Sequence, residues 1–150
     1  MKRKNIAALA VAGAAALGLG IHPAHATATI LPMSGANRTV ASKSTFPGSL
    51  NVRGQVAVSN LSGPAFLFGG PITVTCSLQS RMTGTAGWNT EDTDHVFIAG
   101  GLQSGADGLD VQTDVEATAR MTFRVVCSSV GPFASEPTVV DNASIAITAN

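Results

Sequence analysis

The chain has 150 residues, of which 45% are hydrophobic and 12% charged, and its nine basic residues balance nine acidic ones. This length suits a single domain with one hydrophobic core. Lys2, Arg3 and Lys4 lie in a segment that we expect to be removed, which leaves six basic against nine acidic residues. A net negative charge argues against nucleic acid or an anionic membrane as partner, because both bind basic surfaces.

The first 26 residues have the three parts of a secretory signal peptide. Three basic residues come first, residues 6–21 are apolar or Gly without any charge, and Ala24-His25-Ala26 is the small-residue pattern at which signal peptidase cleaves. The apolar run of 16 residues is shorter than the ~20 of a membrane-spanning helix. We therefore expect cleavage after Ala26, no stable membrane anchor and an extracellular location, with an uncleaved anchor as the alternative. The Ala-rich, Leu-poor apolar run is typical of a bacterial signal.

The mature chain shows the alternation of apolar and polar residues that is typical of β-strands. We expect residues 27–48 to form a partly irregular N-terminal segment and residues 49–150 to form the core of the domain. A bulge is expected at Gly54, and polar or Gly-rich connections at Thr83–Thr93 and Gly100–Gly108. Strands are expected at Thr29–Leu31, Arg38–Ser42, Leu50–Val58, Ala65–Phe68, Ile72–Met82, His95–Ala99, Leu109–Cys127 and Val139–Ala149.

The alternation is longest over Leu109–Cys127. A single strand of that length would span about 63 Å at ~3.3 Å per residue, which exceeds a domain of this size. We therefore expect a bend or turn near Glu116–Ala119. With seven to nine strands and no amphipathic helix, the sequence predicts an all-β fold: a two-sheet antiparallel β-sandwich, immunoglobulin-like or Greek-key.

The chain contains two cysteines, Cys76 and Cys127, and both lie on the apolar face of an expected strand. In an oxidising compartment two such residues are expected to form one buried disulfide. On the loop-entropy model it would stabilise the fold by roughly 3–4 kcal/mol.

The segment from Ile72 to Cys127 resembles the core of an immunoglobulin-like domain. Cys76 is followed by Trp88 and then by Cys127, in the order and at the spacing of the two cysteines and the tryptophan of that family. The resemblance implies that the disulfide pins the two sheets together and that Trp88 packs against it. Val125 stands where the family usually has its corner tyrosine.

Seven of the nine acidic residues fall between Glu91 and Glu116. Carboxylates this close repel one another unless a cation or solvent relieves them, so two groups are candidates for Ca²⁺: Glu91, Asp92 and Asp94 in one, Asp107 and Asp110 in the other. The second group also resembles one Ca²⁺-binding nonapeptide repeat, in a single copy. The alternative for both is a solvated acidic loop, and no other cofactor is expected.

Catalytic patterns are sparse in the mature chain. His95 is its one histidine, and no Gly-x-Ser-x-Gly elbow or free cysteine accompanies it. Asp110 and Asp114 could act as an acid–base pair, but Arg120 and Arg124 have the same parity along the expected strand, which favours cross-strand salt pairing. We therefore expect no catalytic site.

The sequence thus predicts a secreted, non-catalytic β-sandwich that acts by surface contact with an extracellular protein or glycan, or as a structural component. One alternative is a carbohydrate- or Ca²⁺-dependent binding module that uses the loops of residues 88–108, with the ring of Trp88 as a stacking platform. Another is a small secreted hydrolase or a protease inhibitor. For an inhibitor, the segment Ser128–Pro132 is the candidate loop.

Overall fold

The structure is a computed structural model that describes residues 28–32, 34–60, 72–98, 106–131 and 138–150. The predicted signal peptide, the expected strand Ala65–Phe68 and most of the Gly-rich connection lie outside these residues. Within them, no helix has the length and apolar character needed to cross a membrane.

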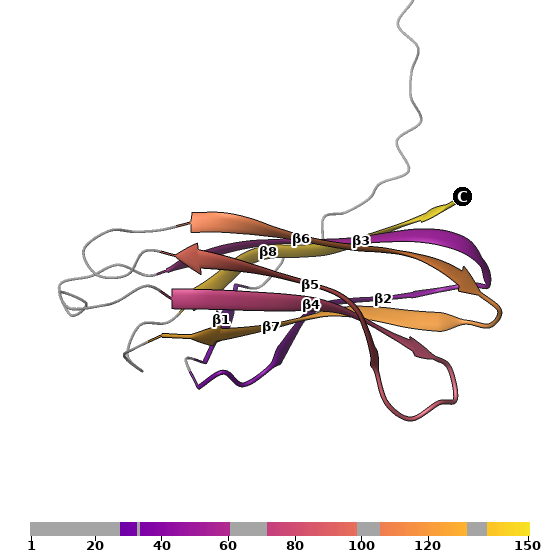
Figure 1. Cartoon of the computed structure of the whole chain (residues 1–150), viewed down its shortest axis with the longest axis horizontal. Coiled ribbons are helices and arrows are strands. Elements are labelled where there is room, and N and C mark those ends of the chain that lie inside the picture. The colour runs from indigo at the N-terminus through magenta and orange to yellow at the C-terminus, as the bar shows by residue number, and fades with distance from the viewer. Residues whose placement is uncertain (1–27, 33, 61–71, 99–105, 132–137) are drawn as a thin grey trace, which may run out of the picture.

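The described residues form eight strands in two antiparallel sheets of four (Figure 1). One sheet has the order β1-β8-β3-β6 and the other the order β2-β7-β4-β5. Consecutive strands alternate between the sheets except for the β4–β5 hairpin, which makes this the jelly roll, a sandwich of two Greek keys. The predicted two-sheet antiparallel sandwich is therefore confirmed. The strands are β1 (Thr29–Leu31), β2 (Arg38–Thr45), β3 (Gly48–Asn60), β4 (Ile72–Met82), β5 (Asn89–Ile98), β6 (Ala106–Ala117), β7 (Met121–Val130) and β8 (Thr138–Ala149).

The core lies between the two sheets and follows the alternation in the sequence. On β4 every even position from Ile72 to Ser80 is buried, and the odd positions between them are partly exposed. Phe123 is the largest fully buried side chain. The predicted turn in Leu109–Cys127 is confirmed, since β6 ends at Ala117 and β7 begins at Met121, but the two strands belong to different sheets.

Gly54 lies in a regular part of β3, paired with Val111 on one side and Ile145 on the other, so the bulge expected there is wrong. The register shift of β3 against β8 lies at Ala57/Val58 instead. A Cβ at position 54 would lie 2.7 Å from Cγ2 of Val125 and 3.0 Å from Cγ2 of Val111. Glycine is therefore required here by the close approach of the two sheets.

Two expected connections are shorter in the structure than in the prediction. Asn89–Thr93 belong to β5, and Ala106–Gly108 belong to β6. Both strands lie at the edge of a sheet; the end of β5 carries polar side chains on both faces, and the end of β6 is Ala106-Asp107-Gly108, which has no large apolar side chain. The alternation that marks a half-buried strand is therefore missing from those ends.

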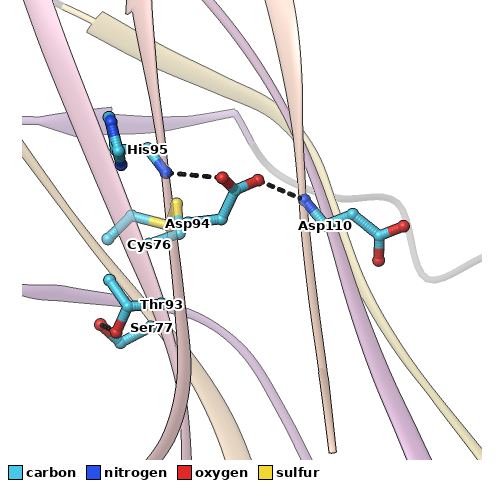
Figure 2. The surroundings of a disulfide bond; sticks show 7 residues. Cys76, Ser77, Thr93, Asp94, His95 and Asp110 are labelled. Atoms are coloured by element: carbon cyan, nitrogen blue, oxygen red, sulfur yellow. Dashed lines mark hydrogen bonds between the residues drawn. A yellow bond between two sulfur atoms is a disulfide. The ribbon is translucent and has the colours of Figure 1, made fainter.

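The disulfide Cys76–Cys127 is present, and both side chains are fully buried (Figure 2). Cys76 and Cys127 are direct partners in the register of β4 with β7, with their Cα atoms 4.1 Å apart. The bond therefore joins two neighbouring strands of one sheet. The pin between two sheets that the immunoglobulin-like resemblance implied is wrong.

Candidate functional site

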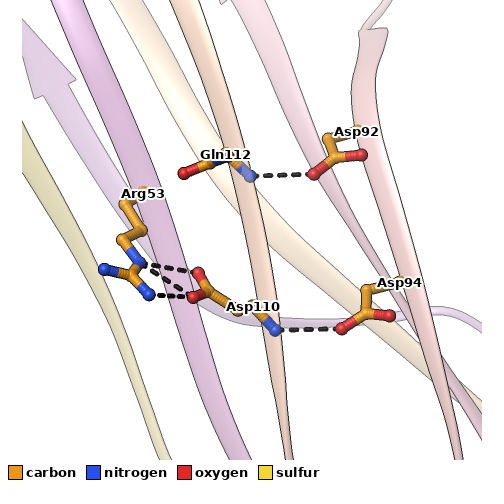
Figure 3. A network of polar contacts seen from close by, with 5 residues as sticks. All are labelled: Arg53, Asp92, Asp94, Asp110 and Gln112. Atoms are coloured by element: carbon orange, nitrogen blue, oxygen red, sulfur yellow. Dashed lines mark hydrogen bonds and ion pairs between the residues drawn. The ribbon is translucent and has the colours of Figure 1, made fainter.

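Asp92 and Asp94 of β5 join the two sheets along one side of the sandwich. Asp94 Oδ2 accepts a hydrogen bond from the backbone amide of Asp110 at 3.1 Å, and Asp92 Oδ2 accepts one from that of Gln112 at 2.9 Å (Figure 3). Asp110 and Gln112 lie on β6, which is the edge strand of the other sheet. We call this arrangement the carboxylate clasp, meaning Asp92 and Asp94 with the amides that they accept.

The second oxygen of each carboxylate bonds to its own strand. Asp92 Oδ1 accepts the amide of Thr93 and Asp94 Oδ1 that of His95, both at 2.8 Å (Figure 2 shows the second pair). Two side chains therefore satisfy four amides on two sheet edges. Unpaired edge amides are the groups through which sheets pair with other chains, so the clasp removes these four as pairing sites.

An ion pair lies on the other side of β6, between Asp110 and Arg53 of β3. Arg53 Nε donates to both carboxylate oxygens, at 2.8 and 2.9 Å, and Nη2 donates to Oδ2. The hydrogen bonds from Arg53 hold the pKa of Asp110 below its ordinary value, and those to Asp110 raise the pKa of Arg53. Both groups are exposed, so solvent screens much of the attraction.

The residues predicted as Ca²⁺ ligands are thus spread over separate contacts. Glu91 accepts a hydrogen bond from the buried Ser80, Asp92 and Asp94 form the clasp, and Asp107 accepts the amide of Gly108. Within the described ranges, no group of three or more His, Cys, Asp or Glu residues is placed to hold a metal ion. Ca²⁺ binding stays a prediction, which a rise in melting temperature with millimolar Ca²⁺ would support.

Trp88 precedes β5 and is partly exposed, and its ring lies against two guanidinium groups. Cζ of Arg124 lies 3.9 Å, and Cζ of Arg81 4.5 Å, from the ring centroid. Both arginines are on the outer face of their sheet, whereas the disulfide is on the buried face. The interpretation that Trp88 packs on the disulfide is therefore wrong. We call Trp88, Arg81 and Arg124 the tryptophan–arginine cluster.

Charge is distributed unevenly over the sandwich. Strands β2, β4 and β7 contain no acidic residue, whereas β6 carries four. Arg124 Nε donates to the neutral Gln79 at 2.9 Å, and Arg53–Asp110 is the one ion pair among the described residues. The guanidinium groups of the cluster thus have no carboxylate partner in that part of the chain. Five of the six basic residues that follow the predicted signal lie on the β2-β7-β4-β5 sheet or the turn before β7: Arg38, Lys43, Arg81, Arg120 and Arg124.

The opposite sheet has a shallow hollow of about 280 Å³ on its outer face. It lies over Ala57, which has a small side chain, and Gly108, which has none. Polar groups of Gln55, Asp110 and Asn142 surround it. It holds no aromatic ring and no buried charged group. The hollow therefore has fewer groups that could bind a ligand than the tryptophan–arginine cluster has.

The other residues that the sequence suggested for catalysis or inhibition make contacts within the fold. His95 packs its ring edge-on against that of Phe97, with centroids 5.7 Å apart. Ser128–Val130, part of the expected inhibitor loop, pair with β4 as the end of β7, and Pro132 lies outside the described residues. The predicted pairing of Asp110 and Asp114 with Arg120 and Arg124 is wrong, because β6 and β7 lie in different sheets. Asp114 instead accepts the side-chain amide of Asn51.

No protein-family model matches the chain, and no curated protein matches it. Among solved structures it is similar to one described as "Structure of infectious bursal disease virus Gx strain", with a TM-score of 0.49 and 11% sequence identity. That match covers 81% of this chain and 30% of the other, so the chain spans less than a third of that protein's length. A likeness of this degree carries no argument about function, which must come from the surfaces of the molecule.

Proposed function

We propose that the chain is an exported, non-catalytic β-sandwich that acts by surface contact, and that its tryptophan–arginine cluster binds an acidic extracellular polysaccharide. The observation that carries the proposal is the pair of guanidinium groups at 3.9 and 4.5 Å from the ring of Trp88. An indole ring offers a stacking surface for a sugar ring, and guanidinium groups bind carboxylates and sulfates by paired hydrogen bonds.

The surroundings of the cluster support the same assignment. Further along the same outer face, strands β4 and β7 carry short, partly exposed polar side chains, including Thr75, Ser77 and Ser128, whose hydroxyl groups can donate to and accept from sugar hydroxyls. Since β2, β4 and β7 lack acidic residues, nothing on these strands repels an anionic chain. β5 of the same sheet carries Glu91, Asp92 and Asp94, but Asp92 and Asp94 are bonded to β6 in the clasp and Glu91 accepts a hydrogen bond from the buried Ser80. The acidic residues on β6 belong to the other sheet.

The intrinsic fluorescence of the protein reports directly on this site, because Trp88 is the one tryptophan in the chain. We expect titration with polygalacturonate to change the Trp88 emission in a salt-dependent manner, and titration with neutral dextran to leave it unchanged. Arg124→Gln should abolish the change. Arg53→Gln, which removes the same charge from the opposite sheet, should retain it.

An equal loss of binding in the Arg53 and Arg124 variants would show that net charge alone is responsible and would overturn the proposal. A response that disappears with a chelator would instead support the Ca²⁺-dependent module. Export is tested separately: protein recovered outside the cells should begin at Thr27.

A further inference from the structure

Among the described residues, the unpaired strand edge with the least protection is that of β8 beyond the short strand β1. β5 and β6 are closed on each other by the carboxylate clasp, and β2 carries Arg38, Lys43 and a register shift, which are features that discourage edge pairing. β8 is paired with β3 along its whole length, but β1 covers its other side only at Thr138–Val140. From Asn142 onward, no described strand pairs with β8 on that side, although β2 of the other sheet packs close to β8 there and its Lys43 reaches the carbonyl of Ile145.

The hydrogen bonds of β8 show which backbone groups face this open side. The amide of Asn150 donates to Ser49 of β3, so the backbone groups of the even residues face β3. The carbonyl of Ile145 faces away from β3 and accepts Lys43 Nζ at 3.4 Å. By the alternation of a β-strand, Ala143, Ile145, Ile147 and Ala149 direct their amides and carbonyls outward. Lys43 occupies one lone pair of one of these carbonyls, and each carbonyl has two.

From Asn142 onward, the residues of β8 themselves carry none of the usual protection against pairing, and Lys43, which reaches this edge, belongs to β2. The segment Asn142–Asn150 contains no charged residue, no proline and no glycine. It is also nearly a palindrome about Ala146: the residues on either side are Ile145 and Ile147, then Ser144 and Thr148, then two alanines, then two asparagines. A strand that reads almost the same in both directions presents the same side chains to an antiparallel copy of itself.

We propose that β8 pairs with β8 of a second copy of this chain, antiparallel about a two-fold axis at Ala146. In this register Ile145 lies opposite the Ile147 position of the second copy, and Ala143 opposite the Ala149 position. Every outward amide and carbonyl from residue 143 to residue 149 then finds a partner. The contact is the same patch on both copies, so it closes as a dimer and joins two four-stranded sheets into one.

The test uses the even-numbered residues of β8, because their side chains from the two copies would meet across the two-fold axis. Ser144 lies opposite the Thr148 position, in a pair whose backbones do not bond to each other and whose Cβ atoms are therefore about 4.5–5.5 Å apart. Both residues are exposed on the outer face of the sheet. The double variant Ser144→Lys/Thr148→Lys therefore places like charges together twice. The matched variant Ser144→Glu/Thr148→Lys places opposite charges together twice.

The experiment is sedimentation velocity over a range of concentrations. It uses protein expressed from the full coding sequence and purified in the form that accumulates. We expect the wild type and the Glu/Lys variant to sediment as dimers. The Lys/Lys variant should sediment as a folded monomer, with a dimer dissociation constant at least roughly tenfold higher than that of the Glu/Lys variant. Amide exchange at residues 143–149 should be slowed only in the proteins that dimerise.

Three results would overturn the proposal: a wild type that stays monomeric throughout, a Lys/Lys variant that dimerises as well as the Glu/Lys variant, and open-ended assembly. The inference goes beyond the proposed function and is separable from it. The β8 edge and the tryptophan–arginine cluster lie on different sheets, so Arg124→Gln should leave the dimer unchanged.

Discussion

Asp94 of β5 accepts the backbone amide of Asp110 of β6, and by this bond a side chain of one sheet completes the hydrogen bonding of the other sheet's edge. Asp92 repeats the contact with Gln112, two residues further along β6. Both carboxylates also accept an amide of their own strand. The clasp therefore links the two sheets and also occupies edge amides of β5 and β6 that could otherwise pair with another chain.

Replacing Asp94 by Ala should destabilise the protein by about 0.5–1.5 kcal/mol, because the amides of His95 and Asp110 both lose their acceptor at a site that water can reach. Urea unfolding measures the change in the free energy of unfolding. Asp114→Ala is the control: its carboxylate accepts only the exposed side-chain amide of Asn51, and the change should stay below about 0.5 kcal/mol. Equal effects of the two changes would contradict a structural role for the clasp.

Gly54→Ala should destabilise the protein by about 1–3 kcal/mol, since its Cβ would lie 2.7 Å from Cγ2 of Val125. Val125→Ala removes that methyl group at the cost of a small cavity. In the double variant the two effects should not add, because the cavity accepts the new methyl. A double-mutant cycle of thermal unfolding measures this coupling, and strict additivity would show that the sheets do not approach as closely as described.

Asp110→Asn should lower stability slightly at neutral pH and not at all in strong acid. The folded state lowers the pKa of Asp110, so its contribution is present above the ordinary carboxyl pKa of about 4 and is lost as pH falls through the lower folded value. The difference in unfolding free energy from wild type should be constant from about pH 8 to pH 5 and shrink as the pH falls below the ordinary carboxyl pKa of about 4. Added salt should reduce it throughout, and a difference that grows in acid would contradict the ion pair.

Reduction of Cys76–Cys127 should lower the free energy of unfolding by roughly 3–4 kcal/mol, because the bond closes a loop across 51 positions of sequence. Since the cysteines are direct partners on adjacent strands, the reduced protein should keep its β-sheet circular dichroism below the transition. Unfolded, unreduced protein should show no free thiol. Two thiols in that titration would exclude the bond.

Features that depend on neighbouring positions could be predicted from the sequence. Alternation marked β4, β6 and β7 as half-buried strands, because each strand directs successive side chains to opposite faces. It also placed Cys76 and Cys127 on the buried face, where the disulfide forms. The same rule failed at Asn89–Thr93, because an edge strand whose two faces are both polar shows no alternation.

Which strands lie side by side was decided only by the tertiary structure. The sequence showed the buried direction of the two cysteines, but not that β4 and β7 are neighbours in one sheet. It showed a cluster of acidic residues, but not that Asp92 and Asp94 face the amides of β6. The physical reason is that side-chain direction follows from the local backbone, whereas the partner of an edge or a face is set by how distant segments pack. The sequence by itself thus determined most of the strands and their buried faces. The packing of the two sheets decided what surrounds Gly54 and which residues meet in the clasp and in the tryptophan–arginine cluster.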